Sequence, residues 1–217
     1  MSDKNTMTYT INRIPPAPLD AIDFSRAEEG RVAYVRPESR AHHPETRFRV
    51  LHDGTAVYVQ FCVKDAHVRS VQTEYQGAVY TDSCVEFFVQ PVKGKGYFNF
   101  EINAGGTLLL TYIEDSTRVP GGFARFQRVD SAWGSQVQIR SSLPRVVEPE
   151  RAAEWSLRVR IPFILFEHYT GIKADHEWRG NFYKCGDSTS HPHWMAWSPV
   201  SALNFHLPDC FGSLSLG

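Results

Sequence analysis

The stretch RFRVLHDGTAVYVQFCV, residues 47–63, predicts a β-hairpin and decides the fold class. Two runs of alternating apolar and polar residues flank His52-Asp53-Gly54, and a glycine between two such runs is typical of a hairpin turn. Successive side chains from Val57 to Val63 point to opposite faces of a strand, which places the apolar set on one face. The stretch therefore predicts two paired antiparallel strands.

The same alternation recurs along the chain. The segment WSLRVRI (155–161) repeats it, and Pro162 marks its end. Two segments, 19–29 and 163–169, have the pattern of a short helix, and 141–151 has that of a long exposed loop. Strands that follow one another without intervening helices predict an all-β antiparallel, jelly-roll-like sandwich. The other predicted strands are SCVEFFVQ (83–90), GYFNFEIN (96–103), TLLLTYI (107–113), FARFQR (123–128) and SQVQIRS (135–141).

Composition limits the class of protein. A chain of 217 residues with a net charge of −1 and no basic cluster predicts one domain and no nucleic-acid partner. It has no apolar run of membrane length and no recognisable export signal, so we expect no membrane partner. The expected location is cytoplasmic, or secreted if a leader was removed. Four scattered cysteines are then expected as reduced thiols.

Polar side chains gather on one face of two neighbouring predicted strands. In GYFNFEIN, alternation places Asn99, Glu101 and Asn103 on one face and three apolar side chains opposite them. In SCVEFFVQ, Glu86 lies on the face opposite the most apolar set. A half-buried strand with a polar face presents that face to solvent or to a ligand. Carboxyl and amide groups together match sugar hydroxyls, which both donate and accept hydrogen bonds.

The stretch NFYKCGDSTSHPHWMAWSPV, residues 181–200, contributes a further strand and loop. We expect Lys184 to face the same side as the two glutamates and Cys185 to face the core. His193 and Trp194 follow at the rim of the predicted sheet, where an imidazole and a ring suit a half-wet ligand site. This stretch is therefore expected to add one cation and a wall to the polar face.

Several of these stretches together resemble a known family. They occur in an order and at distances similar to those of the family 9 carbohydrate-binding module, over roughly residues 19–217, which leaves 1–18 as an N-terminal extension. The resemblance implies a jelly-roll-like sandwich that grips a sugar or the end of a glycan chain between two aromatic rings, often with structural calcium. The stretches are YTDSCVEFFVQP (80–91), YFNFEINAGGTLL (97–109), NFYKCGD (181–187), PHWMAWSP (192–199) and FHLPDCFGSLSL (205–216).

The resemblance assigns the two rings by position. The first ring of the family precedes its Asp-Ser pair by two or three residues, which is Val79 or Tyr80 here, and Tyr80 supplies the aromatic side chain. The second precedes the proline of the closing motif by three residues, which is Phe205. Both positions are usually Trp in the well-known sugar-binding members, so this pair is smaller.

The resemblance also assigns polar groups. The hydrogen-bonding acid of the family corresponds to Glu86, with one extra residue after the serine. The asparagine of its aromatic-Arg-x-Asn strand corresponds to Asn103, and its arginine corresponds to Glu101, a reversal of charge. The resemblance thus implies carbohydrate binding in carbohydrate catabolism, with a mono- or oligosaccharide as ligand and a glycoside hydrolase as a possible partner.

Two other readings use the same residues. A glycoside hydrolase would pair Glu86 with Glu101, since adjacent strands can hold two carboxyl groups about 5–9 Å apart. A zinc site would need Cys185, His191 and His193, although Cys-x5-His-x-His is not a standard ligand spacing.

Two cofactor readings are weaker in sequence. Haem binding, known in related sandwiches, would use Met195 with a histidine as axial ligands, without haem-ligand spacing in the chain. Calcium would need six to eight oxygen ligands, for which Asp20, Asp23 and Asp187 are candidates because they lie in predicted turns. No cofactor is firmly predicted.

Overall fold

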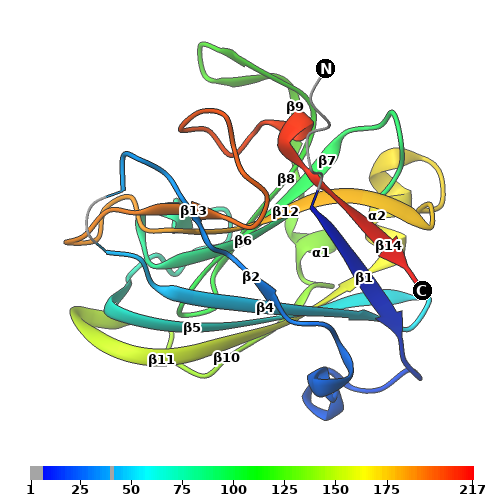
Figure 1. Ribbon diagram of the computed structural model, residues 1–217. Helices are drawn as coiled ribbons and strands as arrows, with labels where there is room; N and C mark the ends of the chain where they lie inside the picture. The colour runs from blue at the N-terminus through cyan, green and yellow to red at the C-terminus, as the bar shows by residue number, and fades with distance from the viewer. Residues whose placement is uncertain (1–6, 40–41) are drawn as a thin grey trace.

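The computed structural model describes residues 7–39 and 42–217, and its strands form two packed layers (Figure 1). The hydrogen-bonded order is β10-β11-β5-β4-β1-β14-β12-β6-β7-β8-β9, one sheet folded onto itself. The first layer consists of β4 (Glu45–His52), β5 (Ala56–Ser70), β10 (Gln138–Ser141) and β11 (Val147–Pro162), with the short β2 (Gly30–Arg31) beside β4. The predicted all-β sandwich in a single domain is confirmed.

The second layer carries the site described below. It consists of β6 (Cys84–Gln90), β7 (Tyr97–Asn103), β8 (Leu108–Val119), β9 (Gly122–Arg128), β12 (Glu177–Cys185) and β14 (Gly212–Leu216). The short β13 (Trp194–Ala196) pairs with β12 and with β3 (Tyr34–Val35).

Strand β1 (Thr8–Arg13) joins the two layers. It runs parallel to both β4 and β14, and Figure 1 shows it beside β14 at the edge of the sandwich. The strand falls inside the predicted extension 1–18, so residues 8–13 contribute backbone pairing to the fold. The boundary at residue 19 stays a prediction.

The hairpin of residues 47–63 is formed by β4 and β5, as predicted. Its turn is fixed by Asp53, whose Oδ1 accepts hydrogen bonds from the backbone N–H groups of Thr55 at 2.7 Å and Ala56 at 2.8 Å. Gly54 has a φ of 88°, a conformation that a side chain would strain. The second strand continues to Ser70, beyond the predicted end.

The core lies between the layers and is made by the alternating apolar faces. Phe48 of β4 stacks on Phe182 of β12 with ring centroids 3.6 Å apart, and Phe182 stacks on Phe87 of β6 at 4.8 Å. These rings are almost completely buried. Burial of large aromatic surfaces is the main stabilising contribution in such a core. It also fixes which face of β6, β7 and β12 points outward.

The helical segments are short. Helical turns occur where predicted, as η1 (Leu19–Ala21), η2 (Phe24–Arg26) and α2 (Phe163–Thr170). The sequence analysis did not predict η3 (Val79–Thr81), α1 (Ser131–Gly134) or η4 (Pro208–Cys210). Within residues 7–39 and 42–217, no helix has the length and apolar character needed to cross a membrane.

The predicted exposed loop 141–151 is partly wrong. Strand β11 already begins at Val147, which is buried and pairs with Ser70 of β5. The register shifts between Val147 and Arg151, and Pro149 lies in this irregular part. A proline cannot donate to a ladder and is tolerated at such bulges, which is why the segment reads as a loop in the sequence.

Candidate functional site

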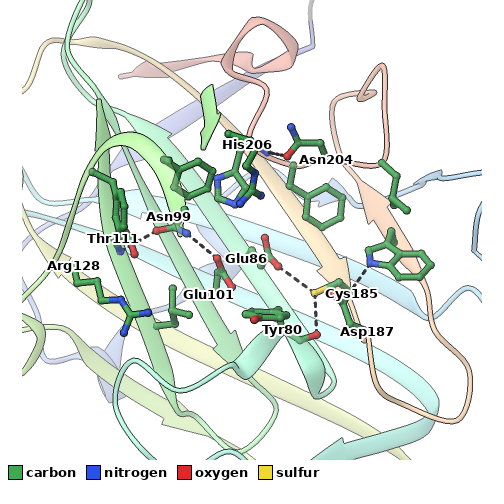
Figure 2. A pocket seen from close by; sticks show the side chains of 18 of the residues that line it. Tyr80, Glu86, Asn99, Glu101, Thr111, Arg128, Cys185, Asp187, Asn204 and His206 are labelled. Carbon is green, nitrogen blue, oxygen red and sulfur yellow. Dashed lines mark hydrogen bonds between the residues drawn. The ribbon is translucent and has the colours of Figure 1, made fainter. Parts of the chain in front are cut away.

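A pocket of about 610 Å³ lies on the outer face of the second layer, away from the core (Figure 2). Its floor comes from β6, β7, β8 and β12, and its walls come from the β8–β9 hairpin, η3, β13 and the loop before η4. Five of the eight residues predicted for the site line it: Tyr80, Glu86, Glu101, Trp194 and Phe205. The volume falls within the range typical of small-molecule pockets, about 300–1,000 Å³.

The floor is a set of buried polar groups linked by hydrogen bonds. Glu86 and Glu101 lie directly opposite each other on β6 and β7. Asn99 donates from Nδ2 to Glu101 Oε1 at 2.7 Å and accepts at Oδ1 from the Thr111 backbone N–H at 2.9 Å. Cys185 Sγ donates to Glu86 Oε1 at 3.1 Å. Each carboxyl group is therefore held in one orientation.

Burial disfavours the ionised form of both floor carboxyl groups. Loss of solvation raises the pKa of Glu101 to about 8, although its hydrogen bond from Asn99 opposes the shift. Burial also raises the pKa of Glu86 well above its usual range, and Cys185 and Glu101 add to the effect. A protonated carboxyl group both donates and accepts hydrogen bonds, as a hydroxyl-rich ligand requires.

Aromatic side chains border the floor. Tyr80 is 40% exposed, and Figure 2 shows its ring on one side of the two carboxyl groups, with Asn204 and His206 on the other. Phe205, between those two in the chain, stacks on Tyr183 with centroids 4.1 Å apart and an interplanar angle of 9°. The support by Tyr183 fixes one face of the Phe205 ring and leaves the other for the pocket.

Trp194 is held at the wall by its indole. Its Nε1–H donates to Asp187 Oδ1 at 2.7 Å. Burial raises the pKa of Asp187, while this hydrogen bond opposes the shift. The ring is thus positioned by a neighbour from the loop after β12.

Two positively charged side chains from the β8–β9 hairpin border the pocket. Arg118 and Arg128 line it, and the Arg118 guanidinium lies over the Phe123 ring at 4.2 Å from the centroid. His206 packs against Phe123, with ring centroids 4.5 Å apart, and shares a hydrogen bond between its Nδ1 and the Tyr97 hydroxyl at 2.9 Å. Burial lowers the pKa of His206 to about 3, so its imidazole is neutral.

The predicted orientation of Lys184 and Cys185 is wrong, and the two are exchanged. Register pairs Tyr183 with Glu86, and Cys185 with Cys84, so Cys185 faces the pocket and Lys184 faces the core. Lys184 is completely buried. A lysine side chain is rarely buried without a partner, and the acid that pairs with Lys184 does not stand near it in the sequence.

Lys184 has its partner in the opposite layer. Its Nζ lies 3.4 Å from Asp65 Oδ2 of β5 and donates to the carbonyl oxygen of Cys185 at 3.0 Å and to His193 Nε2 at 2.7 Å. Burial lowers the pKa of His193 to about 3 with the help of Lys184, so the imidazole accepts as a neutral base. Burial would raise the pKa of Asp65, but Lys184 and hydrogen bonds hold it at about 2. Neither Lys184 nor His193 lines the pocket.

Asn103 makes hydrogen bonds that hold neighbouring segments together. Its Nδ2 donates to Asp82 Oδ2 at 2.9 Å and to the Gln72 carbonyl oxygen at 2.8 Å, and its Oδ1 accepts from the Thr107 backbone N–H at 2.8 Å. It shares the face of Glu101, as predicted, but lies beyond the pocket lining. Its contacts hold together the segments before β6 and after β7.

We expect Asn103→Ala to lower the free energy of unfolding by about 1–3 kcal/mol, because it leaves buried partners unsatisfied. Chemical denaturation followed by fluorescence measures this. Asn12→Ala is the matched control, since Asn12 makes one exposed hydrogen bond to the Arg26 carbonyl oxygen at 3.1 Å. An Asn103→Ala protein as stable as the control would contradict the structural role.

The predicted metal and haem ligand sets do not converge. Cys185 faces the pocket, whereas His193 is buried against Lys184 on the core side, so the two cannot share a zinc ion with His191. Met195 packs in the core. Among the described residues, the acids Asp20, Asp23 and Asp187 do not come close enough together to share one ion.

Several lining residues were not predicted as site residues. Alternation places Asn99 on the polar face with Glu101, and Thr111 pairs directly with Asn99, so the same rule could have identified both. Arg118, Arg128 and His206 had no such signal, since their position depends on how a long hairpin and a loop fold over the sheet. Glu101 stands where the family resemblance has an arginine, and the arginines that line this pocket, Arg118 and Arg128, come from the β8–β9 hairpin instead.

Comparison with known proteins is consistent with this geometry. A protein of Bacteroides uniformis with a provisional carbohydrate-binding assignment is 29% identical, with a TM-score of 0.83, covering 98% of this chain and 100% of its own. Two structures of a family 9 module from Caldicellulosiruptor kristjanssonii, with glucose and with cellotriose, share the fold at 12% and 13% identity. Their TM-scores are 0.66 and 0.62, and the alignments cover 97% of this chain and 96% and 93% of theirs.

A family model decides the assignment. No curated protein sequence matches this chain. The model of "Carbohydrate-binding family 9" matches residues 18–216, nearly the whole chain. This confirms the resemblance seen in the sequence and the carbohydrate-binding function that it implies. The chain therefore belongs to carbohydrate-binding family 9.

Proposed function

We propose that the pocket over β6, β7 and β12 binds a monosaccharide or the end of an oligosaccharide without cleaving it. Glucose and cellotriose, the ligands of the two family 9 neighbours, are the first candidates. Tyr80 and Phe205 would cover the apolar C–H faces of a sugar ring, and Glu86, Glu101 and Asn99 would meet its hydroxyl groups.

The observation that carries this proposal is the combination of floor and walls. Buried hydrogen-bonding groups, each held by a neighbour, form the floor, and rings stand at its edges. A pre-ordered polar floor lowers the entropy cost of binding a small polar ligand. Arg118 and Arg128 at the hairpin add donors to the ligand side.

The same geometry favours binding over hydrolysis. A retaining or inverting glycosidase needs one ionised carboxylate as nucleophile or base beside one protonated acid. Burial raises the pKa values of both Glu86 and Glu101, which disfavours the ionised carboxylate at either position. We therefore place hydrogen bonding, and not acid–base chemistry, at these two groups.

We expect Tyr80→Ala and Phe205→Ala each to weaken sugar binding by about tenfold. A favourable aromatic contact is worth about 0.5–1.5 kcal/mol, and about 1.4 kcal/mol corresponds to tenfold in affinity. Isothermal titration with glucose and cellotriose at millimolar concentration measures the change, because small polar ligands bind weakly.

The matched control is Tyr34→Ala, since Tyr34 is 46% exposed, similar to Tyr80, and lies outside the pocket. Equal weakening in Tyr34→Ala, or no binding by the unchanged protein across a panel of mono- and disaccharides, would overturn the proposal. Release of reducing sugar that disappears in Glu86→Gln would favour the hydrolase reading instead.

The remaining expectations about context stay predictions. A glycoside hydrolase partner would deliver or use the bound glycan end, and co-purification with such an enzyme is the direct test. The cytoplasmic location expected from the sequence is testable by cell fractionation. The four cysteines are free thiols in the structure, which suits a reducing compartment.

A further inference from the structure

Two cysteines and a glutamate meet beneath the pocket. Cys84 and Cys185 lie directly opposite each other on β6 and β12, and Glu86 follows two residues after Cys84 on the same face. Their Sγ and carboxylate oxygen atoms all lie within 4.8 Å of one another. Among the described residues, this is the one group of three acid, histidine or cysteine side chains that close together. Figure 2 shows Cys185 pointing toward Glu86.

We propose that Cys84, Cys185 and Glu86 bind a thiophilic divalent cation of the zinc class at the floor of the pocket. Zinc–sulfur bonds of about 2.3 Å and zinc–oxygen bonds of about 2.0–2.2 Å place tetrahedral ligand atoms about 3.5–3.8 Å apart. The distance from Cys185 Sγ to Glu86 Oε1 is 3.1 Å, and the other two fall below 4.8 Å. Small side-chain rotations would therefore bring the three donors to tetrahedral spacing.

The site has an entrance and an open position. Glu86 and Cys185 line the pocket, so an ion can reach them from solvent, and Cys84 lies completely buried behind them. Three protein ligands leave the fourth tetrahedral position to a water molecule on the pocket side. A hard cation such as calcium is disfavoured, because it requires six to eight oxygen ligands.

A cation at this cluster would have to displace protons from its ligands. Burial raises the pKa of Cys84 to about 11. The pKa of Cys185 is also raised, by the hydrogen bond between Cys185 and Cys84 and by burial. Without an ion the three groups keep their protons and the cluster is neutral. Binding of one divalent ion would form two metal–thiolate bonds and one metal–carboxylate bond and release up to three protons to the buffer.

The test uses the full chain, freed of metal by a chelator and kept reduced with a phosphine. Titration with Co²⁺ should give one equivalent per chain, with thiolate-to-cobalt absorption in the ultraviolet and the visible bands of a tetrahedral site. Added Zn²⁺ should abolish both. We expect Cys84→Ser and Cys185→Ser to remove the thiolate absorption and Glu86→Gln to weaken binding at least about tenfold.

Cys62→Ser and Cys210→Ser are the matched controls, because these free thiols lie outside the cluster and the pocket lining. Circular dichroism checks that each variant is folded. Absence of a thiolate band in the reduced protein would overturn the proposal, as would a band that survives in both Cys84→Ser and Cys185→Ser or is lost in Cys62→Ser. Sugar titration in the presence of chelator is a separate measurement, so this proposal and the proposed function can fail independently.

Discussion

Lys184→Met is expected to lower the free energy of unfolding by about 3–5 kcal/mol at pH 7. Methionine keeps most of the volume of lysine, so the loss reports the missing ammonium group. Asp65 would remain as a buried carboxylate without its cation, and the neutral His193 would lose its donor. Urea denaturation followed by tryptophan fluorescence gives the difference.

The matched control for Lys184→Met is Lys64→Met in β5, the strand that carries Asp65. Lys64 Nζ lies 3.2 Å from Glu154, with both side chains largely exposed, and such a pair contributes at most about 1 kcal/mol. Asp65→Asn should lower the free energy of unfolding by less in the Lys184→Met protein than in the unchanged protein, because the two side chains interact directly. If Lys184→Met unfolds no more easily than Lys64→Met but no longer binds sugar, Lys184 is a ligand residue after all.

The fold could be predicted from local patterns because the strands of both layers alternate apolar and polar residues with a period of two. The hairpin of 47–63 and the strands around Glu86 and Glu101 need only their own residues to show which face is apolar. The start of β11 was not readable, because its pairing with Ser70 depends on a bulge around Pro149. Register shifts of this kind are set by the partner strand and leave no periodic signal.

Tyr80 and Phe205 were predicted from family position alone, and Glu86 and Glu101 from alternation and family position together. Asn103, on which both also agree, lies beyond the pocket lining. Tyr80, Glu86, Glu101, Trp194 and Phe205 all line the pocket.

The interpretation failed at Lys184, since a rule that sends charge to the polar face cannot foresee Asp65, 119 positions earlier in the chain and in the other layer. His193 was misplaced for the same reason, because it is buried and its Nε2 accepts a hydrogen bond from Lys184. Residues that bind each other across a sandwich are visible only once the layers are packed.

Glu101→Gln is expected to stabilise the protein at alkaline pH and to leave it nearly unchanged at pH 5. Burial raises the pKa of Glu101 from 4.5 to about 8, so the folded protein holds a proton that the unfolded chain releases above pH 4.5. Folding stability from this group is therefore complete below about pH 4.5 and is lost as pH rises through about 8. Since one pKa unit corresponds to about 1.4 kcal/mol, the loss by pH 9 is on the order of 5 kcal/mol. Glutamine has no proton to release and avoids it.

The measurement is the free energy of unfolding of both proteins from pH 5 to pH 9, with chelator present so that no bound ion changes the protonation of the floor. Glu177→Gln is the matched control, because this glutamate lies exposed at the start of β12 and accepts a hydrogen bond from Ser215. We expect the difference in unfolding free energy between Glu101→Gln and the unchanged protein to grow from pH 5 to pH 9. The corresponding difference for Glu177→Gln should stay constant. A constant difference for Glu101→Gln would mean that Glu101 is already ionised in the folded protein at pH 5. The floor would then present a carboxylate, and the argument against acid–base chemistry at Glu86 and Glu101 would lose its basis.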